Sequence, residues 1–189
     1  MVSDAVLAGT GIGVFWYYFQ RVVFYNKLLW GFFLLTISMT ALVGVFTFAG
    51  LDSLEPLHQS LEILAGSLGV VCVVMAVWAL LNRQAVQLTG FSVTLALGLA
   101  LFVVLMLPDV RVFAPVVQSL SMLIIMLLAV FGLLRQERYA IWIVLAIMIL
   151  GLATKLPSNG MPLHSTDVYH YAVALALICF GKAVKASKL

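Results

Sequence analysis

Formal charge is what this sequence lacks most. Only 9% of its 189 residues are Asp, Glu, Lys or Arg, whereas a soluble domain typically carries about 25%. So few charges cannot cover a water-exposed surface, which excludes a soluble globular domain. Cysteine is scarce as well. Cys72 and Cys179 lie in separate apolar stretches without a C-x-x-C partner, which argues against a disulfide framework or a reactive thiolate.

Long uncharged runs replace the missing charges. Apolar residues make up 65% of the chain, and a helix needs about 20 of them to cross a hydrocarbon core of about 30 Å. The uncharged runs are 5–20, 28–51, 63–82, 84–108, 112–134, 139–154 and 168–181. The first, sixth and seventh are short unless flanking residues such as Lys182 join them by snorkelling. We predict an all-α integral membrane bundle of seven transmembrane helices, forming a single transmembrane helical domain over residues 1–189.

The connections between these runs differ in charge. Eight of the ten basic residues share one side: Arg21, Lys27, Arg83, Arg135, Arg138, Lys182, Lys185 and Lys188. The positive-inside rule therefore places the N-terminus outside and the C-terminus in the cytoplasm. Four tryptophans near the predicted cytoplasmic ends indicate an aromatic belt there: Trp16, Trp30, Trp78 and Trp142. The predicted location is a bacterial inner membrane, and the net charge of +3 reflects topology, not nucleic-acid binding.

One carboxylate falls inside a predicted span. Glu62 is the only acidic residue that the seven-span arrangement places within a helix, and an intramembrane carboxylate is a functional-site hypothesis by default. His58 and Gln59 precede it by four and three residues, so the three side chains share one side of the helix. Gly66, four residues further on, leaves room for a neighbouring helix. Alternatively, a residue such as Gln118 binds Glu62 and the carboxylate has only a structural role.

A second polar segment, residues 164–171 (H-S-T-D-V-Y-H-Y), stands at the entrance to the last predicted helix. The chain has three histidines, and the topology places all of them outside: His58, His164 and His170. Three imidazoles with an open fourth position suit a catalytic zinc ion, with Glu62 or Asp167 orienting a ligand or acting as general base. Alternatively, Thr166 or Asp167 caps the helix and the histidines are solvated in the headgroup region.

Seven spans with one histidine near an early helix and two at the last resemble a reduced form of the CREST superfamily, which includes alkaline ceramidases and the progestin and adipoQ receptors. Its members are seven-helix membrane hydrolases, or relatives of them, with a three-histidine zinc site, a serine and an aspartate. The resemblance implies that His58, His164 and His170 are ligands and that Asp167 is the acid. The family's serine corresponds to Leu54 here, and its final H-x-x-x-H spacing is six residues in this chain. The ending also resembles uncharacterised bacterial membrane proteins that finish in H-x-x-D-x-x-H.

Three functions follow as hypotheses. The first is a metal-dependent hydrolase near the extracytoplasmic face that acts on a lipid or amide, with zinc as cofactor and with Glu62 and Asp167 as catalytic groups. The second is a binder or carrier for a metal ion or haem. The third is an accessory subunit that packs against other membrane subunits. The lipid bilayer is a partner in each case.

Overall fold

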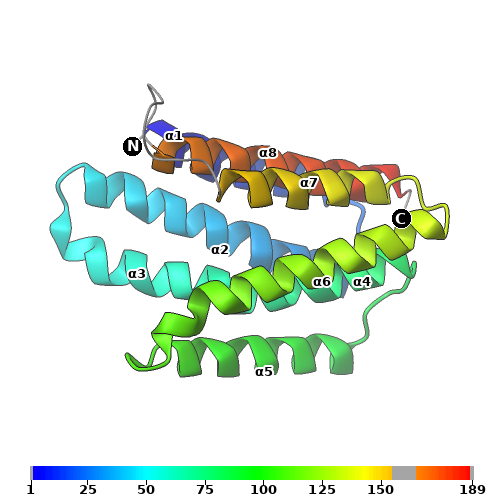
Figure 1. Cartoon of the computed structure of the whole chain (residues 1–189), viewed down its shortest axis with the longest axis horizontal. Coiled ribbons are helices and arrows are strands. Elements are labelled where there is room, and N and C mark those ends of the chain that lie inside the picture. Colours follow the sequence, from blue (N-terminus) through cyan, green and yellow to red (C-terminus); the bar gives the residue numbers. More distant parts are fainter. Residues whose placement is uncertain (1, 155–164, 188–189) are drawn as a thin grey trace.

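The computed structural model describes residues 2–154 and 165–187, which form helices and short connections with no strand among them. The helices are α1 (Val2–Tyr18), α2 (Phe24–Phe48), α3 (Glu55–Leu64), α4 (Val70–Leu81), α5 (Leu88–Leu105), α6 (Ala114–Leu134), α7 (Ala140–Ala153) and α8 (Ser165–Ala186). A π-helical segment, η2 (Ala65–Gly69), joins α3 to α4, so these form one continuous rod. Short 3₁₀ turns, η1 (Asp52–Leu54) and η3 (Arg111–Phe113), precede α3 and α6. The all-α prediction is confirmed, with seven helical rods in the described chain (Figure 1).

Five of the rods are long and apolar enough to cross a membrane within the described residues: Phe24–Phe48, Asp52–Leu81, Leu88–Leu105, Arg111–Leu134 and Thr166–Ala186. The last helix, expected to be short, has 22 residues because its first turn includes Asp167 and its last includes Lys185. An acidic residue in the first turn and a basic residue in the last turn both interact favourably with the helix dipole. The two shorter rods are α1, with 17 residues, and α7, with 14.

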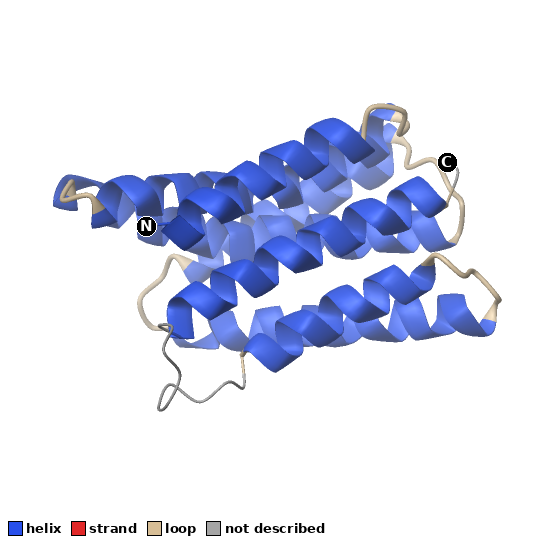
Figure 2. Ribbon diagram, turned by 90° about the horizontal axis from the view of Figure 1, so that it is seen from above, coloured by secondary structure: helices blue, strands red, loops and turns tan. Residues whose placement is uncertain are grey.

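Six of the rods form a closed ring. Around it, α1 packs on α2, α2 on α4, α4 on α6, α6 on α7, α7 on α8, and α8 on α1. The seventh rod, α5, lies outside the ring and packs mainly on η2 and α4 (Figure 1). The view from above shows the rods running alongside one another, as short connections require (Figure 2). The ring arrangement leaves an interior that every rod except α5 can line.

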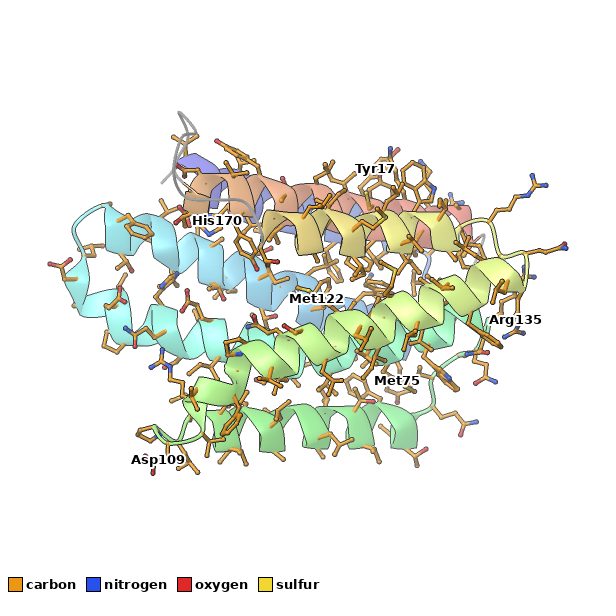
Figure 3. The ribbon with its side chains drawn as sticks, viewed as in Figure 1. Tyr17, Met75, Asp109, Met122, Arg135 and His170 are labelled. Carbon is orange, nitrogen blue, oxygen red and sulfur yellow. The ribbon has the colours of Figure 1, made fainter. Side chains whose placement is uncertain are left out.

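The basic end of the bundle is held together by polar contacts between loops. Arg83 forms an ion pair with Glu137 at 2.8 Å, and Arg135 donates to the side chain of Asn82 at 3.0 Å. The hydrogen bond that Arg83 donates to the Glu137 carboxylate raises the pKa of the Arg83 guanidinium. Arg135 and Asp109 stand at opposite ends of the molecule (Figure 3). The clustering of these basic residues at one end therefore follows from the fold.

The tryptophan prediction is wrong in one place. Trp16 is exposed, as an interfacial residue should be, but Trp30 is only 1% exposed. Its ring packs against Phe19 and Phe180, with centroids 5.3 and 5.7 Å apart. Trp30 is thus a core residue, because the closed ring of helices turns its face of α2 inward. The residue pattern of α2 alone does not show which face is buried.

Candidate functional site

A cavity of about 480 Å³ lies inside the ring of helices. Every rod except α5 contributes to its lining. Polar side chains gather where α1 and α8 begin, whereas deeper positions are apolar, among them Phe33, Ile125 and Leu177. Its volume falls within the range of small-molecule sites, about 300–1,000 Å³. The bundle therefore contains a partly open cavity with a polar end and an apolar interior.

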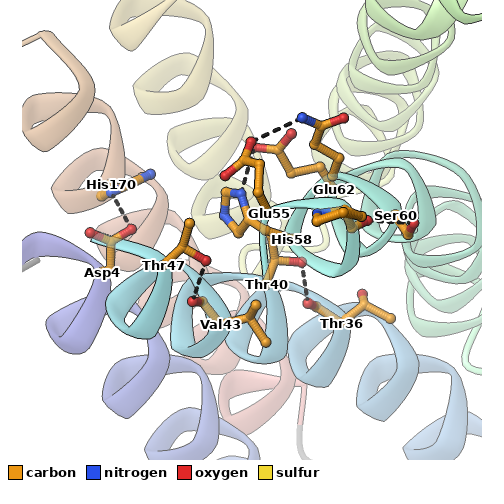
Figure 4. Close-up of polar contacts among 12 residues, drawn as sticks. Asp4, Thr36, Thr40, Val43, Thr47, Glu55, His58, Ser60, Glu62 and His170 are labelled. Atoms are coloured by element: carbon orange, nitrogen blue, oxygen red, sulfur yellow. Dashed lines mark hydrogen bonds and ion pairs between the residues drawn. The ribbon is translucent and has the colours of Figure 1, made fainter. Parts of the chain in front are cut away.

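His170 is held at the polar end by the start of α1. Its Nδ1 lies 3.2 Å from Oδ1 of Asp4 and 3.3 Å from Oγ of Ser3. Ser3 in turn donates a hydrogen bond to Asp167, one turn before His170 on α8. The Asp4 side chain is only 4% exposed. Packing of α1 against α8 thus orients the His170 ring through its Nδ1, and Nε2 lies on the other side of the ring (Figure 4).

A second histidine–carboxylate pair comes from α3. His58 Nδ1 lies 3.9 Å from Oε1 of Glu62, four residues further along the same helix. The Glu62 side chain is 54% exposed, although it lines the cavity, so the polar end of the cavity opens to the outside of the bundle. A Cβ atom on Gly44 would lie 3.1 Å from His58 Nε2 and 3.2 Å from Asp4 Oδ1. The bare backbone of α2 at Gly44 therefore lets the two pairs approach each other.

Glu62, His58, Asp4 and His170 form an alternating series of carboxylates and imidazoles, here called the acid–histidine row (Figure 4). The row draws on α1, α3 and α8, and all four side chains line the one cavity. Imidazole exchanges protons near neutral pH, and a carboxylate on one ring nitrogen orients the other for acid–base chemistry or metal binding. The row is therefore suited to proton transfer with a molecule bound in the cavity.

The π-helical segment follows Glu62 by one turn. Its glycines admit neighbouring side chains: a Cβ on Gly66 would lie 2.5 Å from Nε2 of Gln118, and one on Gly69 would lie 2.8 Å from Oγ1 of Thr36. The expected close approach at Gly66 is thus confirmed, and the approaching residue is Gln118 of α6. Such π-helical turns occur often at functional sites. Here the turn brings the Gln118 amide to the cavity wall beside the acid–histidine row.

The family model that matches this chain covers residues 1–189 and is described as a family of unknown function, DUF6962. The chain belongs to the DUF6962 family. Comparison with curated proteins gives no match, and neither does comparison with solved structures. The family carries no assigned activity that tests the resemblance to the CREST superfamily.

The structure brings together some of the predicted site residues of this DUF6962 chain. His58, Glu62 and His170 all line the cavity. Asp167, predicted to be catalytic, instead accepts the hydrogen bond from Ser3 and is not among the described lining residues. His164, predicted to be a metal ligand, lies outside the described residues. The zinc site of three histidines therefore stays a prediction.

Sequence reasoning missed Asp4. Asp4 directly precedes the first uncharged run, 5–20, whereas the structure includes it in α1 with its side chain buried. Glu62 is consequently not the only acidic residue within a helix. A buried carboxylate this close to the chain start could have been suspected from the Ser3–Asp4 pair directly before an apolar run. Its partner His170 could not, because the two residues are far apart in sequence.

Within residues 2–154 and 165–187, no group of three His, Cys, Asp or Glu side chains is arranged to hold a metal ion. Asp4 and His170 contact each other directly, and Glu62 approaches His58 and not a shared centre. The described residues do not fit a metal site by themselves. Among the described residues, the acid–histidine row supplies the acid–base groups of the cavity.

Proposed function

We propose that this protein is a membrane-embedded hydrolase that cleaves an ester or amide bond of an amphiphilic lipid in the central cavity. The observation that carries the proposal is the orientation of His170, whose Nδ1 lies 3.2 Å from a buried carboxylate inside a cavity with one polar and one apolar end. A histidine anchored at Nδ1 by a carboxylate has the arrangement of a general base. The cavity supports a substrate with both polar and apolar parts.

Hydrolysis assigns a role to each member of the row. His170 Nε2 accepts a proton from water as the water oxygen attacks the carbonyl carbon, and Asp4 stabilises the imidazolium that forms. His58, with Glu62 beside it, delivers a proton to the leaving oxygen or nitrogen. The Gln118 amide, which also lines the cavity, is positioned to donate to the carbonyl oxygen of a bound substrate.

The length of the cavity supports a lipid substrate. Its lining residues on α8 run from Thr166 to Phe180, which at 1.5 Å per residue corresponds to about 21 Å along the helix. The deeper part of that wall consists of Val173, Ala176, Leu177 and Phe180. An acyl chain that enters this apolar part places its linkage to the head group beside His170.

The membrane orientation is part of the proposal. Arg83, Arg135 and Lys185 lie at the end of the bundle away from the acid–histidine row. By the positive-inside rule, the basic end faces the cytoplasm and the polar end of the cavity faces outward. In a bacterial inner membrane, the substrate would then come from the outer leaflet or from outside the cell.

Zinc gives a second form of the same proposal. It requires His164 to join His58 and His170, with Asp4 or Glu62 orienting a ligand. Elemental analysis of the purified protein decides between the two forms. About one zinc per chain that is lost in His164→Ala supports the metal form, and zinc-free protein that retains turnover supports the metal-independent one.

Turnover of a panel of acyl esters and acyl amides by protein in liposomes tests the proposal. We expect His170→Gln to lower turnover by about 10²–10⁴-fold, the usual contribution of a general base. The matched control is Glu55→Gln, because Glu55 is exposed at the start of α3 and hydrogen-bonds to Gln59 at 2.9 Å outside the cavity. Unchanged turnover in His170→Gln contradicts the assignment of the base.

An accessory role is favoured by a separate observation. In the candidate spans of α5 and α6, only 17% of residues are buried within the chain. These faces suit lipid or a neighbouring membrane subunit. Cross-linking from α5 in native membranes that captures one defined partner, together with an absence of turnover across the panel, supports this alternative.

A further inference from the structure

We infer that the head group recognised in the central cavity is a cation, such as a protonated amine or a quaternary ammonium, and that Glu62 is its counter-ion. This inference names the substrate class of the same cavity and so rests on the proposed function for its biological meaning. It excludes lipids whose only charged group is a phosphate or carboxylate as the preferred ligands.

The charge balance of the acid–histidine row favours a cation. The row contains two carboxylates and two imidazoles, and each imidazole is either neutral or singly positive. With both carboxylates ionised, the row is negative or neutral and is never positive. No lysine or arginine is found among the lining residues in the described part of the chain. Arg111 contacts Gln59 at 3.4 Å at the same end of the bundle but does not line the cavity.

Glu62 is the accessible carboxylate of the row. Its side chain is 54% exposed and lines the cavity, whereas the Asp4 side chain is 4% exposed and held against His170. The distance of 3.9 Å between Glu62 and His58 exceeds hydrogen-bond length. A head group that enters the polar end can therefore reach the Glu62 carboxylate without breaking the contact between Asp4 and His170.

Aromatic rings also line the cavity. Tyr169 and Phe48 line the same cavity as the row, and the centroid of the Tyr169 ring lies 6.2 Å from that of His170. Aromatic faces attract ammonium groups, and the attraction is stronger where water is excluded. An anionic head group would meet a carboxylate and would gain no such attraction from these rings. A carboxylate beside aromatic rings is an arrangement that favours cations over anions.

Binding of three amphiphiles with the same chain tests the inference. Hexadecyltrimethylammonium, hexadecanol and hexadecyl phosphate are titrated separately into the full-length protein in nanodiscs of uncharged lipid, with empty nanodiscs subtracted. Coulombic attraction to the Glu62 carboxylate and cation–π attraction to the aromatic rings predict that the ammonium binds about tenfold or more tightly than the alcohol. The phosphate should bind most weakly.

Variants of the same helix separate the role of Glu62 from general effects. Glu62→Gln should weaken ammonium binding about tenfold and leave hexadecanol within about twofold. Glu62→Asp keeps the charge and should keep the preference for the ammonium. Glu55→Gln is the matched control outside the cavity and should change nothing. Size-exclusion profiles identify any variant that has not folded.

Two results would overturn the inference. One is phosphate binding as tight as ammonium binding, and the other is an equal effect of Glu62→Gln on all three ligands. Because the readout is binding, the result is independent of hydrolysis. Ammonium selectivity without turnover supports the cationic ligand class and contradicts the hydrolase proposal. Turnover of anionic lipids supports the hydrolase proposal and contradicts the cationic ligand class.

Discussion

The contact between Asp4 and His170 predicts a measurable coupling between the first and last helices. Asp4→Ala and His170→Ala each remove one partner, and the double variant removes both. The interaction free energy from this cycle isolates the pair from the other contacts of each residue. The pair joins positions 166 residues apart, so its loss also tests whether α1 and α8 are neighbours.

The distance and burial of the two side chains determine the expected coupling free energy. Opposite unit charges separated by 3.2 Å attract by about 5 kcal/mol at an effective dielectric constant of about 20. Desolvation of the two groups cancels much of this, and hydrogen bonds to charged groups contribute about 1.5–3 kcal/mol net. The Asp4 side chain is 4% exposed and that of His170 is 18% exposed, so solvent screening is weak. We expect a coupling of about 1.5–3 kcal/mol at a pH at which His170 is protonated.

Reversible unfolding in mixed detergent micelles, monitored by steric trapping, provides the free energies. The control cycle uses Glu55→Ala and Gln59→Ala, because that exposed pair is hydrogen-bonded at 2.9 Å within one helix. Exposed pairs of this spacing are worth about 0.2–0.5 kcal/mol. A coupling between Asp4 and His170 no larger than this control would refute the argument that a buried ion pair ties α1 to α8.

Three further predictions concern packing, topology and pH. Gly98→Ala should lower the free energy of unfolding by about 1–3 kcal/mol, because the added Cβ would lie 2.9 Å from Cα of Leu68 in the facing rod. The control Gly13→Ala should be neutral or stabilising in the same unfolding assay, because its Cβ would meet nothing within 4 Å. Cysteines introduced at Ser53 and Ala85, both exposed, should react with an impermeant maleimide in intact cells at Ser53 only, and labelling at Ala85 alone would reverse the orientation. Burial raises the pKa of the Tyr139 phenol, so the unfolded chain loses this proton first and stability falls as the pH rises above about 10. In Tyr139→Phe, the loss of stability measured between about pH 10 and pH 12 should be shallower.

Several structural features were accessible from local sequence. The predicted run 112–134 became α6 at Ala114–Leu134, and 139–154 became α7 at Ala140–Ala153. Such agreement is expected because charged groups are costly in hydrocarbon, which confines them to the ends of spans. The helical spacing of His58 and Glu62 likewise follows from the 3.6-residue repeat, and the structure places them 3.9 Å apart.

Other features depended on which helices are neighbours. The charge pattern does not indicate that α5 lies outside the ring or that Trp30 is buried. Nor does it indicate that a π-helical turn joins α3 to α4. Asp4 joined the site only because α1 packs against α8, and Gly44 mattered only because α2 passes beneath His58.

The physical reason is the range of the interactions involved. Transfer of apolar side chains into lipid acts on each segment separately, so the sequence alone determined the helical class and the approximate helix boundaries. Lipid does not favour one apolar neighbour over another, so helix pairing depends on close packing of small residues and on a few buried polar contacts. The acid–histidine row, whose members span residues 4–170, is a product of that pairing, and only the tertiary structure decided it.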